Sequence, residues 1–209
     1  MSAETVADDP DGRYGPDGGF DIIVIAASAG GLAALSRVLG DLPADLPVPV
    51  VIVQHLDPRH RSLMADILRR RTLLQVEQAT DGVKLQPATA YVAPPDAHLL
   101  VTSSGCVNLS HSEPVHFVRP SADLLFESSA GAYPGRTIGV VLTGTGSDAN
   151  MGVQAIAQTG GRVIAQDPAT AEFAGMPQAA VNTGAVDVVL DLEEVGPALV
   201  ALIMGEHQT

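Results

Sequence analysis

The stretch DIIVIAASAGGL, residues 21–32, opens with a continuously apolar and largely β-branched run and ends just past a glycine pair. A run of this length and composition is typical of a strand buried on both faces of a sheet. Apolar residues at helical spacing, Leu32, Leu35, Val38 and Leu39, come next. The stretch therefore predicts a buried strand, a tight turn and a helix, the unit from which parallel sheets are built.

Strand-like and helical patterns continue to alternate along the rest of the chain. Further strands are predicted at 47–55, 137–144, 161–167 and 186–190, and further helices at 62–71, 121–132, within 146–160, 177–183 and 193–204. Short runs separated by turn residues at 74–118 predict hairpins or short antiparallel strands attached to the main sheet. The predicted fold class is α/β: a doubly wound, mainly parallel sheet with helices on both faces and a short antiparallel hairpin region.

Length and composition predict one domain with a tail. The chain has 209 residues and 46% apolar content, enough for a single core, which is predicted over residues 21–209. Residues 1–20 are rich in Gly, Pro and Asp without periodicity, and they predict a disordered tail or linker. The single cysteine, Cys106, excludes an internal disulfide framework and is typical of a reducing, cytoplasmic location.

Two classes of partner are not expected. The chain has no signal-peptide pattern and no apolar run near the ~20 residues that span a bilayer, so we expect no membrane insertion. Its formal net charge is −13. Because the phosphate backbone would repel such a chain, nucleic acid is not expected to bind it.

Polar residues stand where the predicted strands end. In an open parallel sheet, the loops at the carboxyl ends of the strands form the functional edge. Ser28 ends the first strand, His55 ends the second, and Asp148 and Asp167 follow two later ones. A serine, a histidine and a carboxylate are the components of acyl transfer, in which the base takes the proton of the nucleophile and the carboxylate orients the base.

Each of these residues also has a purely structural interpretation. Ser28 could cap the helix after it, His55 could bond to backbone, and Asp148 could be the N-cap of the helix within 146–160. A phosphate-binding turn is a further alternative for residues 26–31. The sequence AASAGG lacks two glycines of the dinucleotide fingerprint, however, and the chain has no P-loop.

The histidines do not form a metal-binding pattern. His55 and His60 are five residues apart, and so are His111 and His116. Paired ligands on a helix need the i, i+4 spacing of H-E-x-x-H. We therefore expect no metal site.

Six motifs occur in a fixed order along the chain. They are IAASAGG (25–31), VIVQHL (51–56), YVAPPDAHLLV (91–101), HFVRPSADLLF (116–126), LTGTGSDANMG (142–152) and AQDPATAEFAGMPQAAVNTGAVDVVL (165–190). From about Asp21 to Ile203 they resemble the catalytic domain of the CheB family of chemotaxis protein-glutamate methylesterases. The resemblance implies a serine hydrolase without a cofactor, whose triad falls on Ser28, His55 and Asp148 rather than Asp167.

The resemblance also implies the parts around the triad. The backbone N–H groups of Ala29 and Thr145 would bind the oxyanion, while Gly30 and Gly31 would keep the serine turn open. Residues expected to support the cleft and its turns are Gly144, Gly146 and Met176.

Three positions depart from the family pattern. Ala26 and Ala149 stand where glycine is usual, and Thr145 stands where Met is common. None of them removes a member of the triad, so we expect effects on rate or substrate preference only.

The implied reaction is hydrolysis of glutamate γ-methyl esters on the cytoplasmic helices of methylated chemoreceptors, or on a related signalling protein. Deamidation of receptor glutamines is a second implied activity. The best-known family members carry an N-terminal receiver domain, which residues 1–20 are too few to form. We therefore expect a stand-alone domain, a fragment, or a relative serving another pathway.

Rival hypotheses are a non-catalytic docking module of the same fold and an esterase for another ester. Arginines cluster between Arg59 and Arg71, shortly after His55. They predict either a solvated helix face or a docking patch for an acidic partner, in which Arg59 and Arg61 assist.

Overall fold

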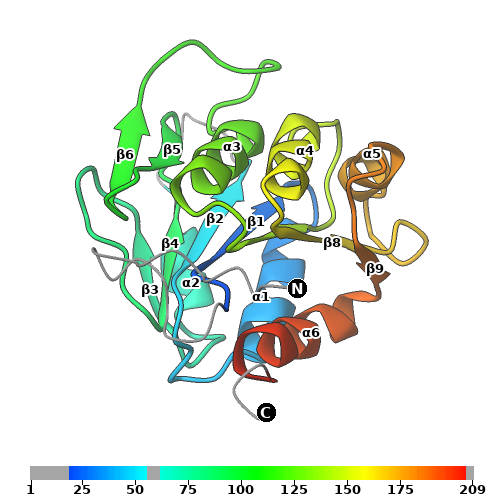
Figure 1. The fold of residues 1–209 in the computed structure, drawn as a ribbon, viewed down its shortest axis with the longest axis horizontal. Coiled ribbons are helices and arrows are strands. Elements are labelled where there is room, and N and C mark those ends of the chain that lie inside the picture. The colour runs from blue at the N-terminus through cyan, green and yellow to red at the C-terminus, as the bar shows by residue number, and fades with distance from the viewer. Residues whose placement is uncertain (1–18, 56–61, 206–209) are drawn as a thin grey trace, which may run out of the picture.

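The computed structural model describes residues 19–55 and 62–205 (Figure 1). Within these residues a seven-stranded sheet forms the middle layer, and every neighbouring pair of its strands is parallel. Its strands lie in the order β3 (Gln75–Gln78), β4 (Thr89–Val92), β2 (Val50–Gln54), β1 (Ile22–Ala27), β7 (Thr137–Val141), β8 (Arg162–Gln166) and β9 (Val188–Leu190). Beside it, β5 (His98–Val101) and β6 (Val107–Ser110) form a two-stranded antiparallel sheet.

Helices cover both faces of the large sheet, as predicted. One face carries α1 (Gly31–Gly40), α2 (Met64–Leu68) and α6 (Leu192–Met204); the other carries α3 (Ala122–Ala132), α4 (Asn150–Gln158) and α5 (Gly175–Asn182) (Figure 1). Successive residues of β1 point to opposite layers: Ile23 belongs to the core under α1, and Ile22 to the core under α3. All of β1 is buried, which confirms a strand buried on both faces.

Two predictions from the sequence, both for residues 62–118, were wrong. Strands β3 and β4 lie parallel in the main sheet, and among the strands of the described residues the expected antiparallel pairing is confined to β5 and β6. The segment 79–88 has the turn residues of a hairpin but is long enough to return the chain in the same direction. The helix predicted over 62–71 covers only Met64–Leu68. The N–H groups of Arg70 and Arg71 bond to carbonyls three residues back, which is a turn rather than a helix, and the Arg69 guanidinium bonds to the carbonyl oxygen of Val76 in β3.

The strand order contains one topological switch point, between β1 and β7. From β1 the chain moves outward to β2 and on to the edge strand β3, comes back to β4 between them, and then crosses to β7 on the other side of β1. The loops after β1 and β7 therefore diverge, and they leave a crevice at the carboxyl ends of these strands, where ligands bind in such sheets.

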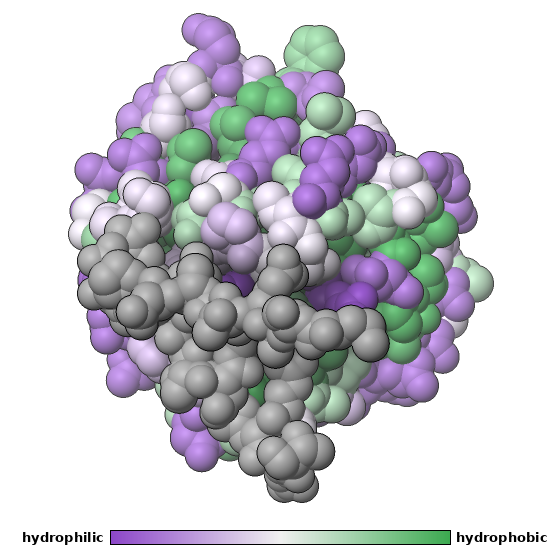
Figure 2. Space-filling view, viewed as in Figure 1, coloured by the Kyte–Doolittle hydropathy of each residue, from purple (hydrophilic) through white to green (hydrophobic). Residues whose placement is uncertain are grey.

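The surface is mixed in character (Figure 2). Apolar residues gather over the edge strand β9, where Val188 and Val189 are 39% and 41% exposed. Among the described residues, no helix has both the length and the apolar character needed to cross a membrane. The tail predicted at 1–20 lies almost entirely outside the described residues and stays a prediction.

Candidate active site

Ser28 stands at the crevice, in the loop between β1 and α1. Its N–H donates to the carbonyl of Thr143 at 3.0 Å, and its carbonyl accepts the N–H of Gly31 at 2.9 Å. The N-cap of α1 is Gly30, and no side chain caps this helix, so the capping interpretation of Ser28 is wrong. No hydrogen bond of Ser28 Oγ to another described residue is formed, and this leaves the hydroxyl available for chemistry.

The two glycines after Ser28, Gly30 and Gly31, stand where a side chain would not fit. Gly30 adopts a φ of 75°, a conformation that side chains disfavour, and a Cβ there would lie 2.8 Å from Glu172 Oε2. A Cβ on Gly31 would overlap the amide of Gln54. That amide is in place because Gln54 Nε2 donates to the carbonyl of Ser28 at 2.7 Å. The turn can thus bend sharply and stay fixed to β2.

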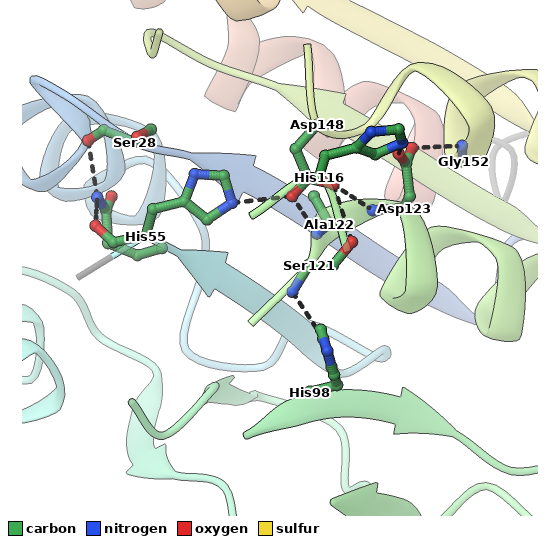
Figure 3. A network of polar contacts seen from close by, with 10 residues as sticks. Ser28, His55, His98, His116, Ser121, Ala122, Asp123, Asp148 and Gly152 are labelled. Carbon is green, nitrogen blue, oxygen red and sulfur yellow. Dashed lines mark hydrogen bonds and ion pairs between the residues drawn. The ribbon is translucent and has the colours of Figure 1, made fainter. Parts of the chain in front are cut away.

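His55 and Asp148 meet at the same edge of the sheet (Figure 3). His55 Nε2 lies 2.8 Å from Asp148 Oδ2, and the two side chains are 15% and 4% exposed. Asp167 is not at this site: its carboxylate accepts the N–H of Ala169 in a local turn. The interpretation of His55 as bonded only to backbone is therefore wrong.

The partner of His55 fixes its tautomer. A carboxylate only accepts hydrogen bonds, so Nε2 carries the proton that it donates to Asp148. In the neutral ring Nδ1 is then the unprotonated nitrogen. The ring lies between Ser28 and Asp148 in Figure 3. Among the described residues no hydrogen bond yet joins Ser28 to this ring, and loose contacts of this kind are common before substrate binds.

Asp148 is held by the N-terminus of α3. Its Oδ1 accepts the hydroxyl of Ser121 at 2.8 Å and the N–H of Asp123 at 3.2 Å, and its Oδ2 accepts the N–H of Ala122 at 2.5 Å as well as His55. Burial alone would raise the pKa of Asp148, but the bonds from His55 and Ala122 outweigh it and lower the pKa below its usual value. The carboxylate is therefore ionised and fixed, as the orienting group of a triad must be.

A second carboxylate forms the reciprocal contact between the two helices. Asp123, in the first turn of α3, accepts the N–H of Gly152 in α4 at 2.9 Å. Asp148, just before α4, accepts N–H groups of α3. We call these reciprocal bonds the carboxylate exchange. The pKa of Asp123 is raised, mainly by burial and also by the charge of Asp148, so the two acids are shifted in opposite directions.

The N-cap of α4 is Ala149 rather than Asp148, so the capping interpretation of Asp148 is wrong too. Ala149 is fully buried and adopts a φ of 100°. This conformation is strained for a residue with a Cβ. The usual glycine of the family would adopt it freely, so the departure at this position places backbone strain next to Asp148.

The predicted oxyanion donors lie on either side of the crevice. Within the described ranges, the N–H groups of Ala29 and Thr145 donate no hydrogen bond to another group. A Cβ on Gly144 would lie 2.8 Å from that of Ser28 and would overlap Met176 Sδ. The loop after β7 therefore packs directly on the serine turn, with Met176 behind it. Gly146 has a φ of 90° and open space around it.

A cleft of about 670 Å³ opens beside Ser28. Its wall is apolar where α1 and α2 line it, through Leu32, Met64 and Ile67. Two charged side chains, Arg71 and Glu172, also line the cleft. The arginines expected to dock a partner, Arg59 and Arg61, lie outside the described residues.

Several residues that build the site were not identified from the sequence. Ser121 begins the helix predicted at 121–132, and it is the N-cap of α3, but its hydroxyl bonds to Asp148 and not to the helix. Gln54 and Gln166 are buried glutamines at strand ends, and Gln166 Oε1 accepts the N–H of Thr143. A long polar side chain ending an apolar strand was the available signal.

A serine beside a histidine–aspartate pair, at the carboxyl ends of adjacent strands, is an arrangement that serine hydrolases use. The family model described as CheB methylesterase matches residues 23–199. A Leptospira interrogans protein is 38% identical over 183 residues, which make up 88% of this chain and 95% of that protein. The crystal structure of the Thermotoga maritima CheB methylesterase catalytic domain has a TM-score of 0.84 and 34% identity, covering 88% of this chain and 99% of that one.

The chain belongs to the CheB methylesterase family. Another relative is the protein-glutamate methylesterase/protein-glutamine glutaminase 2 of Caulobacter vibrioides, 40% identical over 186 residues. The match covers 87% of this chain but only 54% of that protein. The chain thus spans nearly the whole Leptospira protein and about half of the Caulobacter protein.

Proposed function

We propose that this protein is a protein-glutamate methylesterase that hydrolyses γ-methyl esters on the cytoplasmic helices of chemoreceptors or a related signalling protein. We infer that it acts in the cytoplasm and that it also deamidates glutamine at the same positions. The observation that carries the proposal is the His55–Asp148 hydrogen bond of 2.8 Å at the strand ends beside Ser28. Membership of the family supports the choice of substrate.

The mechanism follows from the donors and acceptors of the site. Ser28 Oγ attacks the ester carbonyl carbon while His55 Nδ1 takes its proton, and Asp148 stabilises the resulting imidazolium. The N–H groups of Ala29 and Thr145 stabilise the oxyanion of the tetrahedral intermediate. His55 then returns the proton to the leaving methoxide, which departs as methanol and leaves an acyl ester on Ser28.

The second half of the reaction uses the same groups. His55 Nδ1 takes a proton from water, the resulting hydroxide attacks the acyl carbon, and Ser28 leaves with the proton that His55 gives back. The product is a glutamate carboxylate. With a glutamine side chain, ammonia leaves in place of methanol.

The proposal is tested by methanol release from a methylated receptor, measured with the wild type and with Ser28→Ala. A phosphonate that labels reactive serines provides a second measurement by mass. Ser36→Ala is the matched control, because Ser36 lines the same cleft while its hydroxyl is bonded to the carbonyl of Leu32 at 2.7 Å.

We expect wild type and Ser36→Ala to release methanol and to take up one phosphonate, and Ser28→Ala to do neither. A wild type without either activity would favour the non-catalytic docking module. Phosphonate labelling and hydrolysis of small esters without receptor demethylation would favour an esterase for another substrate.

A further inference from the structure

Two motifs of the sequence, at 91–101 and 116–126, contain no member of the triad, yet the structure joins them behind it. His98, in β5, is completely buried. Its Nε2 lies 3.1 Å from the carbonyl oxygen of Glu113. Its Nδ1 lies 3.1 Å from the backbone nitrogen of Ser121, the contact drawn in Figure 3.

These contacts determine the state of the ring. A carbonyl oxygen only accepts, so Nε2 carries the proton and donates it to Glu113. A backbone N–H only donates, so Nδ1 accepts from Ser121. Both nitrogens of the neutral ring are therefore satisfied, and each bond holds a different segment of the chain.

Ser121 connects the ring to the triad. Its backbone is held by His98, and its hydroxyl donates to Asp148 Oδ1 at 2.8 Å. The next two backbone N–H groups, those of Ala122 and Asp123, donate to the same carboxylate. The position of the first turn of α3 thus sets the position of Asp148, and His98 is a group that holds this turn.

We propose that His98 is a positioning residue for the triad: by accepting the N–H of Ser121, it holds the N-terminus of α3 where that helix presents Asp148 to His55. The proposal rests on the proposed function of the triad. It gives the two-stranded sheet a role, because β5 supplies the ring that anchors α3.

A buried histidine that only fills space would behave differently from a positioning residue, and two conservative variants separate the cases. Asn Oδ1 lies two bonds beyond Cβ, as His Nδ1 does, so His98→Asn keeps an acceptor for Ser121. Gln Nε2 lies three bonds beyond Cβ, as His Nε2 does, so His98→Gln keeps the donor to Glu113 and loses that acceptor. Each variant removes one buried hydrogen bond and part of the ring.

The experiment measures kcat and KM on a methylated receptor, per active site titrated with the phosphonate, together with Tm. We expect His98→Asn to keep kcat within about threefold of wild type. We expect His98→Gln to lose about 10- to 100-fold in kcat with KM unchanged, because misplacement by about 1 Å costs on this scale. Both variants should lose similar thermal stability.

Two further measurements keep the inference falsifiable. Ser121→Ala should reproduce the kcat loss of His98→Gln, and the double variant should be little worse, because both act through Asp148. The proton resonance of His55 Nε2–H should be retained in His98→Asn and displaced in His98→Gln, a readout that does not need turnover.

Equal kcat values for His98→Asn and His98→Gln, with unchanged His55 resonances, would overturn the inference and leave His98 as a packing residue. A wild type that neither turns over nor reacts with phosphonate would overturn the proposed function instead. In that case the His55 resonance would still decide whether His98 positions Asp148.

Discussion

Replacing Asp148 with Asn tests the site most sharply, because the hydrogen bonds predict how the amide will sit. At the Oδ2 position an NH₂ group would oppose the N–H of Ala122, which is 2.5 Å away and cannot rotate. At the Oδ1 position it would face the hydroxyl of Ser121, which can turn to accept, and the more distant N–H of Asp123 at 3.2 Å. We therefore expect the amide oxygen to face His55.

This orientation sets the size of the effect. His55 keeps its proton on Nε2, so Nδ1 can still act as the base, although the charge of Asp148 no longer stabilises the imidazolium. We therefore expect kcat to fall about 10²- to 10³-fold. Triads in which the amide forces the wrong tautomer lose about 10⁴-fold. The free energy of unfolding should fall by about 2–3 kcal/mol, because one backbone donor is left unsatisfied and α3 loses the anion at its N-terminus. For a chain of this length that corresponds to a Tm lower by about 4–12 °C.

The assays are receptor demethylation, thermal unfolding and a nitrogen-15 spectrum of the His55 ring. A loss of 10⁴-fold or more with the proton on Nδ1 would refute the predicted orientation. An unchanged Tm would refute the structural part, in which Asp148 holds α3.

Three further outcomes follow from the same contacts. Asp123→Asn should have a Tm equal to or above that of wild type at neutral pH, and its Tm relative to wild type should rise as pH rises from 4 to 8. The pKa of Asp123 is raised in the folded protein, so ionising this carboxyl costs stability. Unfolding scans across pH check the sign. Gly144→Ala should lower kcat/KM at least about tenfold, because its Cβ would press on Ser28 and Met176, whereas the matched control Gly131→Ala, which meets open space, should keep full activity. Ser28→Ala and His55→Ala should each abolish nearly all methanol release, and the double variant should be little worse, because the pair acts as one unit; additive losses would contradict a triad.

The sequence was most informative where a general rule of parallel sheets applies. Ser28 and His55 follow buried strands directly, so the rule that strand ends carry function identified them before any contact was known. The hydrogen bond between His55 and Asp148 joins residues 93 positions apart, and the choice of Asp148 over Asp167 needed the family resemblance.

The supporting residues could not be predicted in the same way. Whether the hydroxyl of Ser121 caps its own helix or bonds to a distant carboxylate depends on where α4 begins relative to α3. The antiparallel prediction for β3 failed for a related reason: three of its four residues are exposed at the edge of the sheet, so its pattern does not distinguish a parallel edge strand from a hairpin.

The carboxylate exchange between α3 and α4 has a consequence for how relatives of this protein diverge. Functional residues commonly cost stability, so a lineage that no longer needs catalysis is free to replace them. Asp148 does not fit that expectation, because it serves the packing of α3 as well as the base. A non-catalytic descendant would gain nothing by losing this aspartate and would weaken its own fold. The side chain of Ser28 forms no such bonds to the described residues. Loss of this serine is therefore the change that would identify a relative without catalytic activity.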